Sequence, residues 1–185
     1  MNAKIKLTLR ISLIAVYCFI FYKYIQNRDF LWFIDNFNLL IHEGGHMFFY
    51  SFGELLSVMG GTIFQLLVPF IALVIFIKKK DYFSISFSLF WLGTNMFNIA
   101  RYLSDATNQF LPLLHLGTGE PIHDWNYLLS RFGQLENTLI ISDFVYTLGY
   151  ICIFVAIVTG IHVSFREYKS SKIKCIDGLH NNTHT

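Results

Sequence analysis

One group of residues in this sequence has types and spacing suited to metal-dependent hydrolysis: His42-Glu43-Gly44-Gly45-His46. On a helix, residues four apart project from the same face, so His42 and His46 could bind one zinc ion. Glu43 lies one position further round that helix, where its carboxylate could act as general base on a zinc-bound water. The motif therefore predicts a Zn²⁺ site with Glu43 as the catalytic residue.

A catalytic zinc ion needs a third protein ligand and keeps one position open. The segment 104–137 could supply it, and Asp124 is the favoured candidate because it stands beside His123 at the start of an apolar stretch. Asp105 and His123 are its rivals. Asp124 could instead, or in addition, cap a helix that begins at this point, since Asp is a preferred N-cap residue.

Several amide side chains interrupt the apolar segments of the chain. We expect Gln65, Asn95 and Asn98 to face a cavity shared with the motif, as substrate contacts or as partners of the ligands. Each of them could alternatively form a hydrogen bond between helices, which is the commoner role of an isolated amide in an apolar helix.

The composition indicates a membrane protein. Hydrophobic residues make up 54% of the 185 residues, charged residues only 14%, and the mean hydropathy is +0.48. Soluble domains are nearer one quarter charged. The net charge of +2 and the lack of a basic, aromatic-rich surface argue against a nucleic-acid partner. A lipid bilayer is the expected environment.

The apolar runs predict an all-α, polytopic transmembrane helical bundle of about five spans, each long enough for a bilayer core of about 30 Å. The expected spans are 7–24, 30–52, 61–77, 82–103 and 139–163. They form a single domain, 1–165, with a polar loop between the fourth and fifth spans and a polar, basic tail at 166–185.

The orientation of this bundle is ambiguous. Lys78–Lys80 and the basic tail favour the cytoplasm, as do Lys4, Lys6 and Arg10 near the N-terminus. Five crossings would put the two ends of the chain on opposite sides. Either one end breaks the rule, or one segment enters the membrane without crossing it.

A zinc-binding motif inside a hydrophobic segment resembles the site-2 protease class of intramembrane zinc metallopeptidases. The stretch His123-Asp124-Trp125-Asn126-Tyr127-Leu128-Leu129 also resembles a segment of uncharacterised bacterial membrane proteins that carry such a motif. The resemblance implies cleavage of membrane proteins or peptides in the bacterial cytoplasmic membrane. It also implies a third ligand from an Asp-Gly pair in a later helix, but the pair in this chain, Asp177-Gly178, lies in the tail.

The leading hypothesis is thus a membrane-embedded zinc metallopeptidase that hydrolyses peptide bonds of membrane or membrane-proximal proteins. Ionisable residues cost about 2.5–3.5 kcal/mol each at the centre of a bilayer, so a group of three within five positions indicates function. The alternative is a membrane metal-binding protein without peptidase activity, such as a metal transporter, an oxidase or an inactive peptidase-like binding protein.

Overall fold

The computed structural model describes residues 2–113 and 122–181, with side chains through residue 173. Within these residues the chain is all-α, as predicted, and contains no strand. The α-helices are α1 (Ala3–Gln26), α2 (Phe33–Phe49), α3 (Glu54–Lys78), α4 (Tyr82–Ser104), α5 (Asp124–Arg131) and α6 (Thr138–Asn181). Two short 3₁₀ turns, η1 (Tyr50–Phe52) and η2 (Leu135–Asn137), precede α3 and α6.

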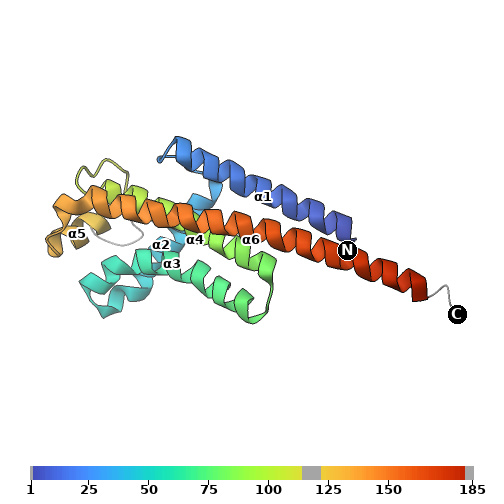
Figure 1. Cartoon of the computed structure of the whole chain (residues 1–185). Helices are drawn as coiled ribbons and strands as arrows, with labels where there is room; N and C mark the ends of the chain where they lie inside the picture. Colours follow the sequence, from blue (N-terminus) through green and yellow to red (C-terminus); the bar gives the residue numbers. More distant parts are fainter. Residues whose placement is uncertain (1, 114–121, 182–185) are drawn as a thin grey trace.

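Four helices, α1, α3, α4 and α6, run along a common axis in alternating directions (Figure 1). The core between them is rich in aromatic side chains, with Tyr24 and Phe97 4.3 Å apart between ring centroids and both almost fully buried. The helices α4 and α6 approach closely at Gly93, where a Cβ atom would lie 3.0 Å from the Gly149 carbonyl oxygen. Small residues at such crossings let helix backbones pack closely.

Contacts between side chains identify the two ends of this bundle. At one end, Glu167 of α6 accepts hydrogen bonds from Lys6 and Arg10 of α1 at 2.8 and 2.9 Å. The Arg10 guanidinium also lies 4.5 Å from the ring of Phe83, at the start of α4. We call this the basic end. At the opposite end, Arg28 pairs with Asp143 at 2.5 Å.

The helix α2 does not run from one end of the bundle to the other. Trp32, its N-cap, contacts Phe90 near the middle of α4, with ring centroids 5.9 Å apart. His42, further along α2, lies beside Tyr102 in the last turn of α4. The chain therefore returns into the bundle after α1, and α2 leads back out toward the opposite end. The predicted count of five spans, which included 30–52, is not confirmed.

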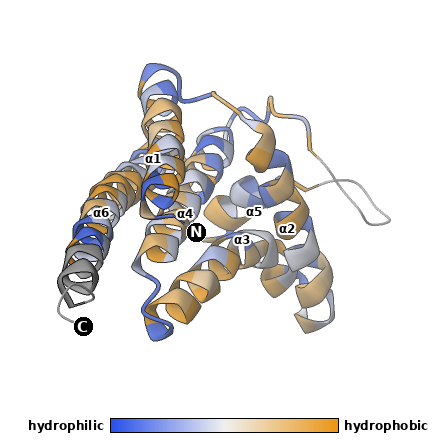
Figure 2. Ribbon diagram, turned by 90° about the vertical axis from the view of Figure 1, so that its right-hand side faces the viewer, coloured by the Kyte–Doolittle hydropathy of each residue, from blue (hydrophilic) through white to orange (hydrophobic). Residues whose placement is uncertain are grey.

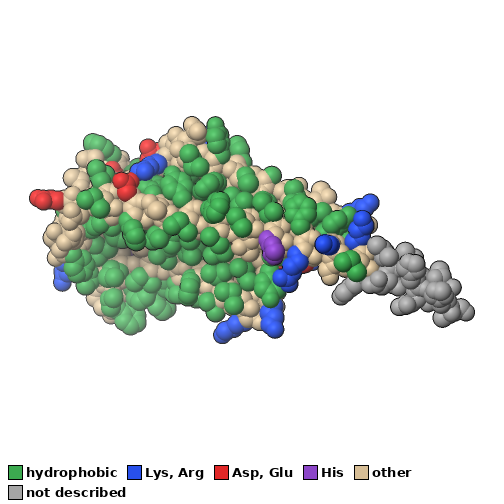
Figure 3. Space-filling view, in the orientation of Figure 1, with side chains coloured by type: hydrophobic (Ala, Val, Ile, Leu, Met, Phe, Trp, Pro, Cys, Tyr) green, Lys and Arg blue, Asp and Glu red, His purple; other side chains and the backbone are tan. Residues whose placement is uncertain are grey.

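Three helical segments are long and apolar enough to cross a membrane: Ala3–Gln26, Glu54–Lys78 and Leu135–Ile173. Hydrophobic residues are frequent on these helices (Figure 2), and hydrophobic side chains cover much of the face in Figure 3. The helix α6 continues past the predicted span 139–163 to Asn181, so the basic segment is helical as far as that residue. Asp177-Gly178 lies in this extension, where side chains are not described.

Candidate metal centre

The motif histidines share one face of α2. Their rings are 4.7 Å apart between centroids. His42 and Glu43 are each only 6% exposed, although both are polar. The same face carries Asp35 and Asn38, which are also buried. This stripe follows from the steps of three and four residues that align side chains on a helix.

Glycines bring α3 against this face of α2. A Cβ atom at Gly45 would overlap the carbonyl oxygen of Gly60, so neither position leaves room for a side chain while the helices keep this spacing. A Cβ atom at Gly61 would lie 2.6 Å from Nε2 of His42 and 2.6 Å from Nε2 of His46. Because residue 61 is glycine, the space between the two Nε2 atoms stays open.

The helix α3 also fixes both imidazole rings through their Nδ1 atoms. Nδ1 of His46 lies 2.7 Å from the carbonyl oxygen of Ser57, and Nδ1 of His42 lies 3.1 Å from Oε1 of Gln65. A backbone carbonyl can only accept a hydrogen bond, so Nδ1 of His46 must donate. This arrangement leaves Nε2 as the ligand atom, and such support of a histidine orients it for a metal.

Asp124 completes the group from the start of α5. Its Oδ2 atom lies 2.9 Å from Nε2 of His42 and 3.2 Å from Nε2 of His46. Its backbone N–H donates to the hydroxyl of Tyr102, at 3.1 Å, which ties the first turn of α5 to α4. Burial acts to raise the pKa of Asp124, but the two histidines outweigh it and hold that pKa below its ordinary value.

The contact between His46 and Asp124 would join two acceptors if His46 were neutral. With the proton of a neutral imidazole on Nδ1, Nε2 of His46 presents a lone pair to a carboxylate oxygen. The short distance is favourable only if Nε2 is also protonated or if a cation lies between the two atoms. Two histidines and a carboxylate are a donor set that catalytic zinc sites use.

The spacing of the three donors also fits zinc. The ligand atoms of His42, His46 and Asp124 all lie within 4.8 Å of one another. Zinc bonds of about 2.0–2.2 Å in a tetrahedral site put ligand atoms about 3.3–3.6 Å apart. The distances of 2.9 and 3.2 Å from Oδ2 of Asp124 to the two Nε2 atoms are slightly shorter than this. After small movements of these three side chains, the group could therefore hold a metal ion. The fourth coordination position of that ion would be left to a water or a substrate.

The two rivals of Asp124 lie away from this group and face each other. Nε2 of His123 is 3.5 Å from Oδ2 of Asp105, whose carboxylate also accepts the backbone N–H groups of Phe110 and Leu111. His123, rather than Asp124, is the N-cap of α5, and its Nδ1 atom accepts from the N–H of Asn126. Burial lowers the pKa of His123, although Asp105 opposes this shift.

The three predicted amides have different positions. Gln65 contacts His42, as described above. Asn98 accepts a hydrogen bond from Asn38 at 3.2 Å and lines the same cavity as the motif. Asn95 is fully buried, donates to the carbonyl oxygen of Trp91 and does not line that cavity. The amide of Asn95 therefore bonds within α4, and only the other two face the site.

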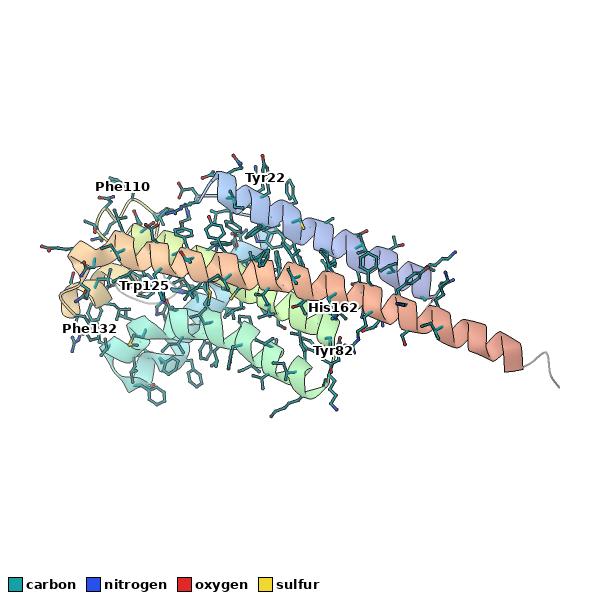
Figure 4. All side chains as sticks on the ribbon, in the orientation of Figure 1. Tyr22, Tyr82, Phe110, Trp125, Phe132 and His162 are labelled. Atoms are coloured by element: carbon teal, nitrogen blue, oxygen red, sulfur yellow. The ribbon has the colours of Figure 1, made fainter. Side chains whose placement is uncertain are left out.

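An open cavity of about 1160 Å³ gives access to the three donors and to Glu43. Apolar and polar side chains both line it; besides the donors they include Leu39, Met47, Ile99, Leu113, Asn36 and Arg101. A cavity of this size exceeds most small-molecule pockets and could hold several residues of an extended peptide. Figure 4 places Trp125 and Phe132 near this end of the bundle, whereas His162 lies on α6 away from it.

Two contributors to the site were not among the sequence candidates. Ser57 acts through its carbonyl oxygen and Gly61 through its missing side chain, and neither feature is a chemical group that a motif would reveal. The step of four residues from Ser57 to Gly61 and on to Gln65, all on one face of α3, could have indicated them. Comparisons with known proteins add nothing here, because no family model, curated protein or solved structure matches the chain.

Proposed function

We propose that the chain is a membrane-embedded zinc metallopeptidase that hydrolyses peptide bonds of membrane or membrane-proximal proteins. The observation that supports it most strongly is the position of His46, with hydrogen-bond acceptors at both ring nitrogens. A divalent cation held by His42, His46 and Asp124 satisfies both contacts of a neutral His46, where a second proton on Nε2 would otherwise be needed. The resemblance of the motif to the site-2 protease class is consistent with the same chemistry.

The chain supplies the groups that such a hydrolysis needs. Bound zinc would polarise the scissile carbonyl and make a water more acidic. Glu43 follows His42 on α2 and lines the same cavity, so its carboxylate can accept a proton from the attacking water and return it to the leaving amine. Gln65 and Ser57 hold the two imidazoles in the orientation that exposes Nε2.

The surroundings of the site favour a membrane substrate. Three helices have the length and composition of membrane spans, and apolar side chains line much of the cavity. We assign the protein to the bacterial cytoplasmic membrane as a multi-pass protein, on the basis of the resemblance. A segment of a membrane-anchored protein could enter the cavity in an extended form and place a peptide bond beside Glu43.

The test is hydrolysis of peptides by the purified, zinc-loaded chain in lipid vesicles, with the variant Glu43→Gln beside it. We expect zinc to stay bound in that variant while cleavage falls at least about 100-fold, the usual contribution of a general base. Glu136→Gln is the matched control, because Glu136 is exposed on η2. Full cleavage by Glu43→Gln would refute the assignment. Zinc binding without any cleavage would favour a metal-binding protein without peptidase activity.

A further inference from the structure

The basic residues of the chain are concentrated at one end of the bundle. Those at the basic end lie in the first turns of α1, in the turn between α3 and α4, and in the last part of α6: Lys4, Lys6, Arg10, Lys78, Lys79, Lys80, Arg166, Lys169, Lys172 and Lys174. Most of the Lys and Arg side chains visible in Figure 3 gather there. The opposite end has four: Lys23, Arg28, Arg101 and Arg131.

The contacts show that these segments truly share one end. Lys6 and Arg10 bind Glu167 of α6, and Arg166 lies 5.5 Å from the ring of Tyr82, the first residue of α4. Since Tyr82 is only two residues after Lys80, all three basic segments meet at this end of the bundle. The helix α6 spans 44 residues, about 66 Å at 1.5 Å per residue, so its basic part extends beyond a bilayer core of about 30 Å.

Five crossings would put the two basic ends of the chain on opposite sides of the membrane. Because α2 turns back, this conflict does not arise. The helices α1, α3, α4 and α6 each run from one end to the other, whereas α2 begins beside the middle of α4 and reaches the last turn of α4 at His42. Counting α4, which packs against α3 and α6, with the three apolar helices gives four crossings, and these put the N-terminus and the end of α6 on the same side. All basic segments can then follow the rule that Lys and Arg near spans stay in the cytoplasm.

The metal centre lies toward the other side. Its ligands contact Ser57 near the start of α3 and Tyr102 near the end of α4, and both positions are at the end opposite to the basic one. The residues that line the cavity come from 31–65, 98–113 and 122–124, and none comes from the basic end. The connection 104–137 carries a single Lys or Arg, Arg131.

We infer that the basic end faces the cytoplasm and that the site receives its substrates from the extracytoplasmic side. That the site acts on substrates rests on the proposed function. The side of the membrane on which the site lies rests on the contacts described above. The substrate class is then a peptide segment at or beyond the outer surface of the membrane, in a protein anchored there, rather than a cytosolic segment. The end of α2, the start of α3 and α5 form the entrance on that side.

Two matched serine variants test the orientation. Ser130 on α5 and Ser170 on α6 are both exposed and lie at opposite ends, so Ser130→Cys and Ser170→Cys make the same change on the two sides. Each is made in a chain whose Cys18, Cys152 and Cys175 are replaced by serine, and is expressed in a bacterial host. An impermeant maleimide should label Ser130→Cys in intact cells and Ser170→Cys only after the membrane is opened.

Labelling of Ser170→Cys in intact cells, or no labelling of Ser130→Cys there, would overturn the inference. The readout needs neither zinc nor turnover, so a chain that also carries Glu43→Gln must give the same pattern. If the labelling is as expected but the zinc-loaded chain cleaves nothing, the orientation stands and the peptidase assignment fails. If cleavage occurs while the labelling is reversed, the assignment stands and the extracytoplasmic substrate class is wrong.

Discussion

The substitution Gly61→Ala should weaken metal binding strongly while leaving the helices intact. The added methyl group would lie 2.6 Å from Nε2 of both His42 and His46, about 0.8 Å inside ordinary van der Waals contact. The two rings must move apart by a comparable distance, and zinc sites tolerate only about 0.2 Å of variation in ligand distance. We expect at least 100-fold weaker zinc affinity, equivalent to about 2.7 kcal/mol.

The assay is competition for zinc between the purified variant and a chromophoric chelator, with helix content and thermal unfolding measured on the same sample. Alanine favours a helix over glycine by up to about 1 kcal/mol, so α3 itself should not weaken. The matched control is Gly44→Ala, inside the motif, where an added Cβ atom would have no neighbour within 4 Å. If Gly61→Ala bound zinc as tightly as Gly44→Ala, the three donors would not surround the metal as described.

Two further substitutions test Asp124 as a metal ligand and Gln65 as the residue that orients His42. Asp124→Asn keeps the size of the side chain but removes its charge, and should weaken zinc binding at least tenfold; Asp105→Asn is the control, because that carboxylate binds backbone N–H groups instead. Equal loss of zinc in the two variants would contradict the assignment of Asp124. Gln65→Leu removes the acceptor beside Nδ1 of His42 and should weaken zinc binding about 10–100-fold, with partial recovery in Gln65→Glu. Wild-type affinity in Gln65→Leu would show that this hydrogen bond does not orient the ligand.

Much of the candidate site follows from local spacing in the sequence. His42 and His46 share a helix face because they are four residues apart, and their burial in an apolar segment makes them conspicuous. Asp124 was favoured because of its type and its place at the start of a helix, and the structure brings it to both histidines. Its capping role was an open alternative, and His123 takes that role instead.

The path of α2 could not be predicted in the same way. An apolar segment has the same hydropathy whether it crosses a membrane or turns back within it, so hydropathy alone predicts a span over 30–52. The return is set by tertiary contacts, such as Trp32 with Phe90 and Gly45 with Gly60, which depend on residues distant in sequence. Asn95 is a different case, because its amide makes a local bond to the carbonyl oxygen of Trp91, four residues earlier in the same helix, and the sequence does not distinguish this role from a contact with the cavity.

The central claim, that His42, His46 and Asp124 hold one zinc ion, is tested most directly by X-ray absorption at the zinc edge. The purified chain should carry no histidine tag, and a variant with His180→Ala and His184→Ala excludes zinc bound by the tail. The account predicts one zinc per chain with nitrogen and oxygen ligands at about 2.0–2.2 Å, two of them imidazoles, and loss of one imidazole in His46→Ala. A sulfur ligand at about 2.3 Å, or a zinc environment unchanged in His46→Ala, would contradict it.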